Sequence, residues 1–434
     1  MTIRGLAIGG YAGNAINVDS AANTRIIGCF IGTDASGVQA ETNGTGILVQ
    51  LPSSGAVIGD SSPADRNVIS GNTFTGIRVF FAPGAVIRGN SIGMNAAGTA
   101  GIPNGSGIIL DGDATFVGGL NAGEGNVIAH NSGQGVRVVS GTGNPIVGNA
   151  IFGNGALGID VGQIGVTAND TGDGDTGPNN LQNFPVLTST GVGVNTTVHG
   201  TLNSRPNILY LVEIFSNTSC DPGFFGEGET SLGTMTVTTN ATGNFAVVGT
   251  FPPVPAGRFI TATATDQTTG DTSEFAACRT ALQAGISVGP LSLQTTEANE
   301  GVGFDAELTV RATTVPVANV VIPMSIQDST EGAIVSQTPL TITPAMGTAS
   351  QTVRINGVDD GIDDGNLAYA ALIRGFSLVA FTQRVKLTRY DSRIRAPLCS
   401  GRSPAPTRTT TASIRPPSWS STTTSCCNVP RARR

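Results

Sequence analysis

Two carboxylates at alternate positions are the side chains of this sequence best placed to do acid–base chemistry. Asp111 and Asp113 stand in the stretch "IILDGDATF". In an extended strand alternate side chains share one face, which would put these two carboxylates roughly 6 to 7 Å apart. A carboxylic acid and a carboxylate at about that separation can carry out inverting glycoside hydrolysis. A turn at the end of a strand explains the same two residues, so catalysis at Asp111 and Asp113 is one of two open interpretations.

A second acidic cluster lies in the glycine-rich stretch "NDTGDGDTGPNN" and consists of Asp170, Asp173 and Asp175. Carboxylate oxygens are ligands that calcium prefers, and alternating acids with intervening glycines are typical of calcium-binding loops. The spacing differs from the D-x-D-x-D-G motif, and no Glu follows at the twelfth position of the loop. The cluster therefore indicates either a calcium site or an ordinary turn that leaves the preceding elements.

Four further acids fall in one short loop: Asp359, Asp360, Asp363 and Asp364. Like charges this close repel one another unless a hard cation or solvent screens them. Calcium is the cation that we expect here, with a solvated acidic turn as the alternative.

Several other chemistries lack the residues that they need. No Lys precedes Lys386, which leaves the body of the chain without a P-loop lysine or a Schiff-base lysine. His130 and His199 are the only histidines and fall in different predicted domains, so no zinc ligand set is visible, and His130 is expected to be a corner residue. Residues 1–374 hold 12 Arg and 29 acidic residues, and this acidic balance argues against nucleic-acid binding.

Repeated short strands must position the first two of these acidic sites. "NVISGNTFTGIRVF", residues 67–80, recurs as "NVIAHNSGQGVRVV", residues 126–139. Aligned on such stretches, the chain has equivalent strand starts at Ala15, Gly46, Gly76, Gly107, Gly135 and Gly158. After each start, alternate residues form two apolar ladders: Ile16, Ile47, Ile77, Ile108, Val136, Ile159, and Val18, Val49, Val79, Leu110, Val138, Val161. The residues between the ladders are mostly polar, so we expect them to face outward.

Each repeat unit carries two more short strands, with Gly and Asn at corners where positive φ is needed. Three strands per turn predict a parallel β-helix. Through "NVISGN", "GNSIG" and "GNAIFGNGALGIDVG", residues 1–185 resemble the right-handed parallel β-helix repeat proteins of secreted and cell-surface type. The resemblance implies an extracellular or cell-surface location, on a fold that hosts lyases, hydrolases, adhesins and spacers alike. Because Met1 begins inside the repeat and no signal peptide is visible, we expect an N-terminal cap and any signal peptide to be missing.

From Val194 the pattern changes to longer strands separated by turn signals, such as "ILYLVEIFSN" and "RFITATATD". This spacing predicts an immunoglobulin-like β-sandwich over residues 186–282. Cys220 and Cys278 both lie within it. In an oxidising compartment they would form a disulfide, and two reduced, unrelated thiols are the alternative.

Residues 283–374 are predicted to form another all-β unit. "TTEANEGVGFDAELTV", "DSTEG" and "VDDGIDDGNLAYAALI" resemble a Calx-beta domain, a calcium-associated extracellular sandwich. The resemblance implies that the acidic loop at Asp359–Asp364 binds calcium together with Glu297 or Glu300 and with Asp328. No clear last strand precedes residue 375, which favours a truncated unit.

Composition changes abruptly at residue 375. Residues 375–434 hold 11 basic residues and a single acid, Asp391, and are rich in Ser, Thr and Pro. Such a segment is typical of a disordered tail, and a change in every residue class at once also fits translation out of frame. A basic tail that binds nucleic acid or another surface is the alternative.

These features lead to two functional hypotheses. The first is an extracellular modular structural or adhesive protein, in which a β-helix and two sandwich modules contact polysaccharides or other cell-surface components, with calcium as the expected cofactor. The rival is a polysaccharide-active enzyme, a glycoside hydrolase or lyase, acting on the flank of the β-helix. No stretch approaches the roughly 18 apolar residues of a membrane span.

Overall fold

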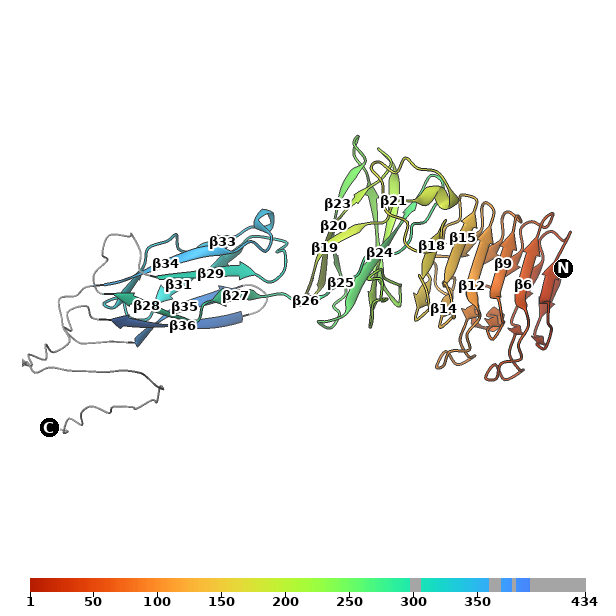
Figure 1. Cartoon of the computed structure of the whole chain (residues 1–434), viewed down its shortest axis with the longest axis horizontal. Helices are drawn as coiled ribbons and strands as arrows, with labels where there is room; N and C mark the ends of the chain where they lie inside the picture. Colours follow the sequence, from red (N-terminus) through yellow and green to blue (C-terminus); the bar gives the residue numbers. More distant parts are fainter. Residues whose placement is uncertain (297–305, 359–367, 377–379, 391–434) are drawn as a thin grey trace, which may run out of the picture. The chain divides into compact units, whose positions relative to one another are not determined.

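The computed structural model describes residues 1–296, 306–358, 368–376 and 380–390. Their regular secondary structure is almost entirely β, which confirms the predicted all-β class: stacked parallel sheets come first and mainly antiparallel, sandwich-like sheets follow (Figure 1). The described helical segments are three short 3-10 turns: η1 (Pro63–Asp65), η2 (Pro178–Leu181) and η3 (Pro344–Met346). Within the described part of the chain, no helix has the length and apolarity needed to cross a membrane.

Three parallel sheets of six strands each build the β-helix. Sheet 1 contains β1 (Thr2–Arg4), β4 (Arg25–Ile27), β7 (Val57–Ile58), β10 (Val86–Ile87), β13 (Phe116–Gly118) and β16 (Ile146–Val147). Sheet 2 contains β2 (Ala7–Ile8), β5 (Phe30–Ile31), β8 (Val68–Ile69), β11 (Ser91–Ile92), β14 (Val127–Ala129) and β17 (Ala150–Phe152). Sheet 3 contains β3 (Asn14–Val18), β6 (Thr45–Gln50), β9 (Thr75–Phe80), β12 (Ser106–Asp111), β15 (Val136–Ser140) and β18 (Ile159–Val161).

The register of sheet 3 confirms both predicted ladders. Ile16 pairs with Ile47, and the same row continues through Ile77, Ile108, Val136 and Ile159. The second row runs through Val18, Val49, Val79, Leu110, Val138 and Val161. All twelve side chains are buried in one apolar core. Because each coil places the same kind of side chain above its neighbour, the repeat in the sequence becomes a continuous core.

Buried asparagines form two further ladders at the corners. In each ladder the amide Nδ2 of one Asn donates to Oδ1 of the Asn in the next coil. One ladder consists of Asn67, Asn90, Asn126 and Asn149, and the other of Asn43, Asn72, Asn104, Asn131 and Asn154. The same amides bond backbone groups at the bends, so polar backbone that leaves the sheets stays satisfied inside the core. These asparagines therefore satisfy buried backbone groups in addition to allowing the chain to turn.

Two four-stranded sheets follow and make the first sandwich. One contains β19 (Val186–Val192), β20 (Thr196–Asn203), β23 (Asn244–Phe251) and β26 (Leu282–Gln283). The other contains β21 (Leu209–Asn217), β22 (Thr230–Thr238), β24 (Phe259–Asp266) and β25 (Arg279–Thr280). Their facing side chains, including fully buried Tyr210, form a separate core. A disulfide joins Cys220 to Cys278 with their Cα atoms 6.4 Å apart.

The second sandwich has two four-stranded sheets and a two-stranded one. The first contains β27 (Ile286–Gly289), β29 (Ala306–Ala312), β34 (Gln351–Gly357) and β32 (Gly332–Ile334). The second contains β28 (Ser292–Thr296), β36 (Ala380–Tyr390), β35 (Ala368–Phe376) and β31 (Met324–Ile326). The pair is β30 (Val320–Ile322) and β33 (Leu340–Ile342).

The strand pairing corrects the predicted boundary at residue 375. Strand β36 lies in the segment assigned to the tail, yet it pairs with β35 and with β28. Its Leu387 is fully buried in the core of the second sandwich. The basic residues Arg384, Lys386 and Arg389 hid this strand when the segment was judged by its composition, because a strand needs only one apolar face. The sandwich thus has the last strand that the sequence analysis did not find.

Candidate functional site

Two exposed aromatic side chains lie where the coil that contains β9 leaves sheet 3 and turns toward sheet 1. Phe80 is the last residue of β9 and Phe81 follows it, and they remain 39% and 46% exposed. Their ring centroids lie 4.7 Å apart in an edge-to-face arrangement. Leu51, which is also exposed, donates its N–H to the Phe80 carbonyl oxygen from the coil before. These residues, together with Gln50, Arg78 and Asp111, are called the aromatic corner below.

A charged neighbour contacts the Phe80 ring, and polar residues flank Phe80 along the sheet. The Arg78 guanidinium carbon lies 5.3 Å from the centroid of the Phe80 ring, a cation–π contact. Its Nε donates to Asp111 Oδ2 over 2.9 Å, and the Asp111 side chain is nearly buried. Along the sheet, Phe80 has Gln50 on one side and Asp111 on the other. The corner therefore presents fixed aromatic surface next to hydrogen-bonding groups.

Gly112, directly after β12, allows its coil to pass close to Phe81 in the coil before. Its φ of +137° is in the region that favours glycine, and an added Cβ would lie 3.0 Å from the Cα of Phe81. The absence of a side chain at this position leaves room beside the Phe81 backbone and ring, which an added Cβ would approach to 3.6 Å at Cδ1. The sequence "LDGD" thus contributes to the corner through Gly112 as well as through Asp111.

The two acids predicted as a catalytic pair have separate partners. Asp111 ends β12 and forms the ion pair with Arg78. Asp113 lies beyond the strand, is exposed, and accepts the backbone N–H of Thr142 from the next coil over 2.7 Å. Because the strand ends at Asp111, the alternation that would align the two carboxylates does not extend to Asp113. Catalysis by this pair stays a prediction.

The loop after the β-helix brings Asp170, Asp173 and Asp175 together, with one carboxylate oxygen from each within 4.8 Å of the others. Asp173 is buried and accepts hydrogen bonds from the Asn183 N–H and, more closely, from the Ser204 hydroxyl. Burial and, less strongly, the charges of the two other aspartates raise the pKa of Asp173 to about 6, against those hydrogen bonds, which lower it. Burial and then Asp170 also raise the pKa of Asp175.

Two oxygens of this cluster have no hydrogen-bond partner although they are buried: Asp170 Oδ1 and Asp175 Oδ1. Three carboxylates in mutual contact offer hard oxygen ligands, fewer than the six to eight that calcium takes. Backbone carbonyls or water would have to complete the set. Calcium binding at this loop stays a prediction, which calorimetric titration of the chain with calcium at millimolar concentration would check.

The acids of the Calx-beta resemblance are only partly visible. Glu297, Glu300, Asp359, Asp360, Asp363 and Asp364 lie outside the described residues. Asp328 is described, and its Oδ1 accepts hydrogen bonds from the N–H and hydroxyl of Thr330 two residues on. That is the geometry of a local turn around an aspartate.

His130 stands at a corner of the β-helix, as its place in the repeat predicts. Its φ is +59°, a conformation uncommon for residues other than glycine, and its ring packs edge-on against Phe152. Nothing in these contacts links it to a metal ligand set among the described residues.

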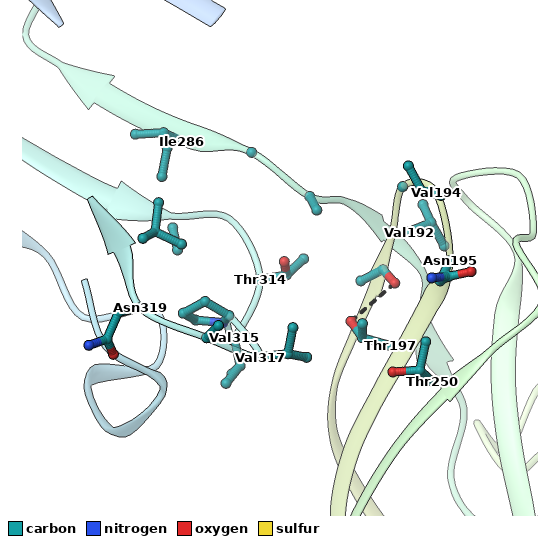
Figure 2. Close-up of a pocket in the computed structure, with 18 residues that line it drawn as sticks. Val192, Val194, Asn195, Thr197, Thr250, Ile286, Thr314, Val315, Val317 and Asn319 are labelled. Carbon is teal, nitrogen blue, oxygen red and sulfur yellow. Dashed lines mark hydrogen bonds between the residues drawn. The ribbon is translucent and has the colours of Figure 1, made fainter. Parts of the chain in front are cut away.

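An apolar cavity of about 330 Å³ lies elsewhere, between residues 191–197 and residues 312–320 (Figure 2). Valines, small residues and Thr314 line it, and the Thr197 hydroxyl donates to the Gly191 carbonyl oxygen at its edge. No charged side chain contributes to the lining. The cavity lining therefore lacks titratable groups for acid–base chemistry.

Comparisons with known proteins do not assign this chain to a family. No protein-family model matches the chain, and no curated protein matches it. Among solved structures, the periplasmic chaperone SfaE matches with 17% identity and a TM-score of 0.20, over 25% of this chain and 58% of its own. The immunoglobulin pair IG1+IG2 of DIP-gamma matches with 12% identity and a TM-score of 0.19, over 48% and 98%. Alpha-2-macroglobulin from E. coli matches with 13% identity and a TM-score of 0.17, over 48% and 17%.

This chain thus spans less than two thirds of the length of SfaE and of alpha-2-macroglobulin. TM-scores this low carry no information on function. The strand pairing itself defines the class: an all-β chain of stacked parallel sheets followed by sandwich-like sheets.

Proposed function

We propose that this chain is an extracellular structural or adhesive protein that contacts polysaccharide at the aromatic corner of its β-helix. The observation that carries the proposal is the exposed Phe80–Phe81 pair, held by Arg78 and flanked by Gln50 and Asp111. Aromatic faces carry negative charge density, so they attract the weakly positive C–H groups on one face of a sugar ring. Amide and carboxylate groups beside the rings can bond its hydroxyls.

The outer row of sheet 3 continues along the β-helix on either side of the corner. Its residues Leu48, Arg78, Ile109 and Arg137 are all half-buried, and an extended sugar chain could lie along this row. The disulfide between Cys220 and Cys278 supports an oxidising, extracellular location, because such bonds are rare in reducing compartments.

The test is binding of the full chain to a panel of neutral and acidic polysaccharides, compared with a Phe80→Ala, Phe81→Ala variant. We expect the double substitution to weaken binding about tenfold or more, equivalent to about 1.4 kcal/mol, because both stacking surfaces are lost. The matched control is Phe74→Ala, which removes an aromatic ring that is 66% exposed at another corner of the same coil. Equal weakening by both variants, or no binding to any member of the panel, would refute the proposal.

The second candidate function is cleavage of the same polysaccharide, which the position of Asp111 beside the aromatic rings favours. It predicts release of new reducing ends that is lost in the Asp111→Asn, Asp113→Asn variant. Binding without release of reducing ends would leave the adhesive role alone.

A further inference from the structure

The last coil of the β-helix ends against side chains of the first sandwich. A stack of parallel strands leaves a row of backbone N–H groups without partners at its end, and such groups are costly to bury. Here side chains from residues 213–274 are acceptors, and the Gly228 carbonyl oxygen accepts the Ile151 N–H. The Gly148 N–H donates to Glu213 Oε1 over 2.9 Å, and the Val161 N–H donates to Glu274 Oε1 over 3.0 Å.

Glu227 continues an asparagine ladder with a carboxylate. Asn131 donates to Asn154 Oδ1, and Asn154 Nδ2 donates in turn to Glu227 Oε1 over 2.8 Å. The same carboxylate accepts the backbone N–H groups of Gly153 and Asn154. Glu227 thus occupies the place that the asparagine of a further coil would take.

Apolar side chains close the centre of the stack. Phe215 and Phe275 of the first sandwich are buried in the core of the β-helix, with their rings edge-to-face at 5.5 Å. Gly158 lies directly beneath, where an added Cβ would come within 2.9 Å of the Phe275 ring. Because rings and carboxylates together cover the end of the stack, the first sandwich serves as a cap on the β-helix.

We propose that this cap is sensitive to pH: Glu213, Glu227 and Glu274 hold the end of the β-helix more firmly in mildly acidic than in mildly alkaline solution. Their carboxylates are buried at the interface, with relative exposures of 1%, 7% and 3%. A buried carboxylate carries a large desolvation cost when it ionises. Oε2 of Glu213 has no hydrogen-bond partner to offset that cost.

The pKa values agree with the geometry. Burial raises the pKa of each of the three glutamates from 4.5 to about 7, against the backbone N–H groups that lower it. Neighbouring carboxylates raise two of these pKa values as well: Asp221 raises the pKa of Glu227, and Asp160 raises the pKa of Glu274. Arg137 faces Asp160, His130 packs beside Gly153, and Asp271 binds the Gly143 N–H at the same end of the coil.

The sign follows from proton linkage. The folded cap holds protons that the unfolded chain releases, so the stabilisation is fully present below pH 4.5 and is lost as pH rises through about 7. For one glutamate with these two pKa values, the opening equilibrium of the cap rises roughly 70-fold between pH 5 and pH 8.

Amide hydrogen exchange of the full chain, corrected for the intrinsic pH dependence of exchange, tests the proposal. Protection of residues 143–161 is expected to fall between pH 5 and pH 8, while that of β9 stays constant. In Glu213→Gln, the fall in protection between pH 5 and pH 8 is expected to be about 70-fold smaller than in the unchanged chain. Glutamine still accepts the Gly148 N–H but does not titrate. The matched control Glu307→Gln, in an exposed pair with Arg354 of the second sandwich, is expected to leave the fall unchanged.

Protection that does not depend on pH, or the same fall in Glu213→Gln as in the unchanged chain, would overturn the proposal. If Glu213→Gln does not fold, the carboxyl carbons of ¹³C-labelled glutamates can be titrated by NMR in the unchanged chain. Three midpoints near 7 would support the cap, and midpoints near 4.5 for every glutamate would refute it.

Discussion

The two faces of sheet 3 differ in how strictly they repeat. The inward rows hold only Ile, Val and one Leu in six successive strands, whereas the outward row between them reads Asn17, Leu48, Arg78, Ile109, Arg137 and Asp160. An inward residue must fit against the same kind of residue in the coils before and after it, because protein cores are close-packed. The outward residues from Asn17 to Arg137 are exposed or half-buried and are free to vary, whereas Asp160, in the last strand, is buried. The inward face therefore carries stability, and the outward face is where a specific surface such as the aromatic corner can arise.

The largest expected effect is on the inward face. Ile77→Ala should lower the free energy of unfolding by about 2 to 5 kcal/mol, because the side chain is fully buried and the coils above and below limit collapse of the cavity. Ile109→Ala is the matched substitution on the outward, half-buried row and should cost much less. Denaturant unfolding of both variants measures the difference. Similar losses would break the comparison between the two faces.

The next largest loss of stability is expected in the asparagine ladder that contains Asn104. Asn104→Ala should destabilise the chain by about 2 to 4 kcal/mol, because the N–H and Nδ2 of Asn72 both lose their acceptor, Asn104 Oδ1, inside the core. Asn17→Ala, at an exposed position of the outward row, should change stability by less than about 0.5 kcal/mol. Thermal or denaturant unfolding separates the two. A small loss for Asn104→Ala would mean that water replaces the ladder.

Much of the β-helix could be predicted from the sequence because its signals are local and repeated. The period of two between Ile16 and Val18, reproduced in every coil, defines both strand and register. The asparagine ladders were not predicted in full, since a turn-forming Asn and a stacked, buried Asn look alike in one sequence. Strand β36 was missed because its basic residues dominated the composition.

The sites were harder to predict than the fold. Phe80 and Phe81 form a surface only because the next coil ends in Asp111 and Gly112, about thirty residues later in the chain. A signal was present nonetheless, because "VFF" breaks the polar pattern that follows other sheet 3 strands. The capping glutamates gave no signal, since Glu213 and Gly148 are 65 residues apart and share no motif.

The most direct test of the account is a crystal structure of the full chain with an oligosaccharide from a polysaccharide that it binds. The account predicts a sugar ring stacked on Phe80 or Phe81, with its hydroxyls near Gln50 or Asp111 and the chain lying along the outer face of sheet 3. A sugar bound only to the sandwiches, or in the apolar cavity near Thr314, would contradict it.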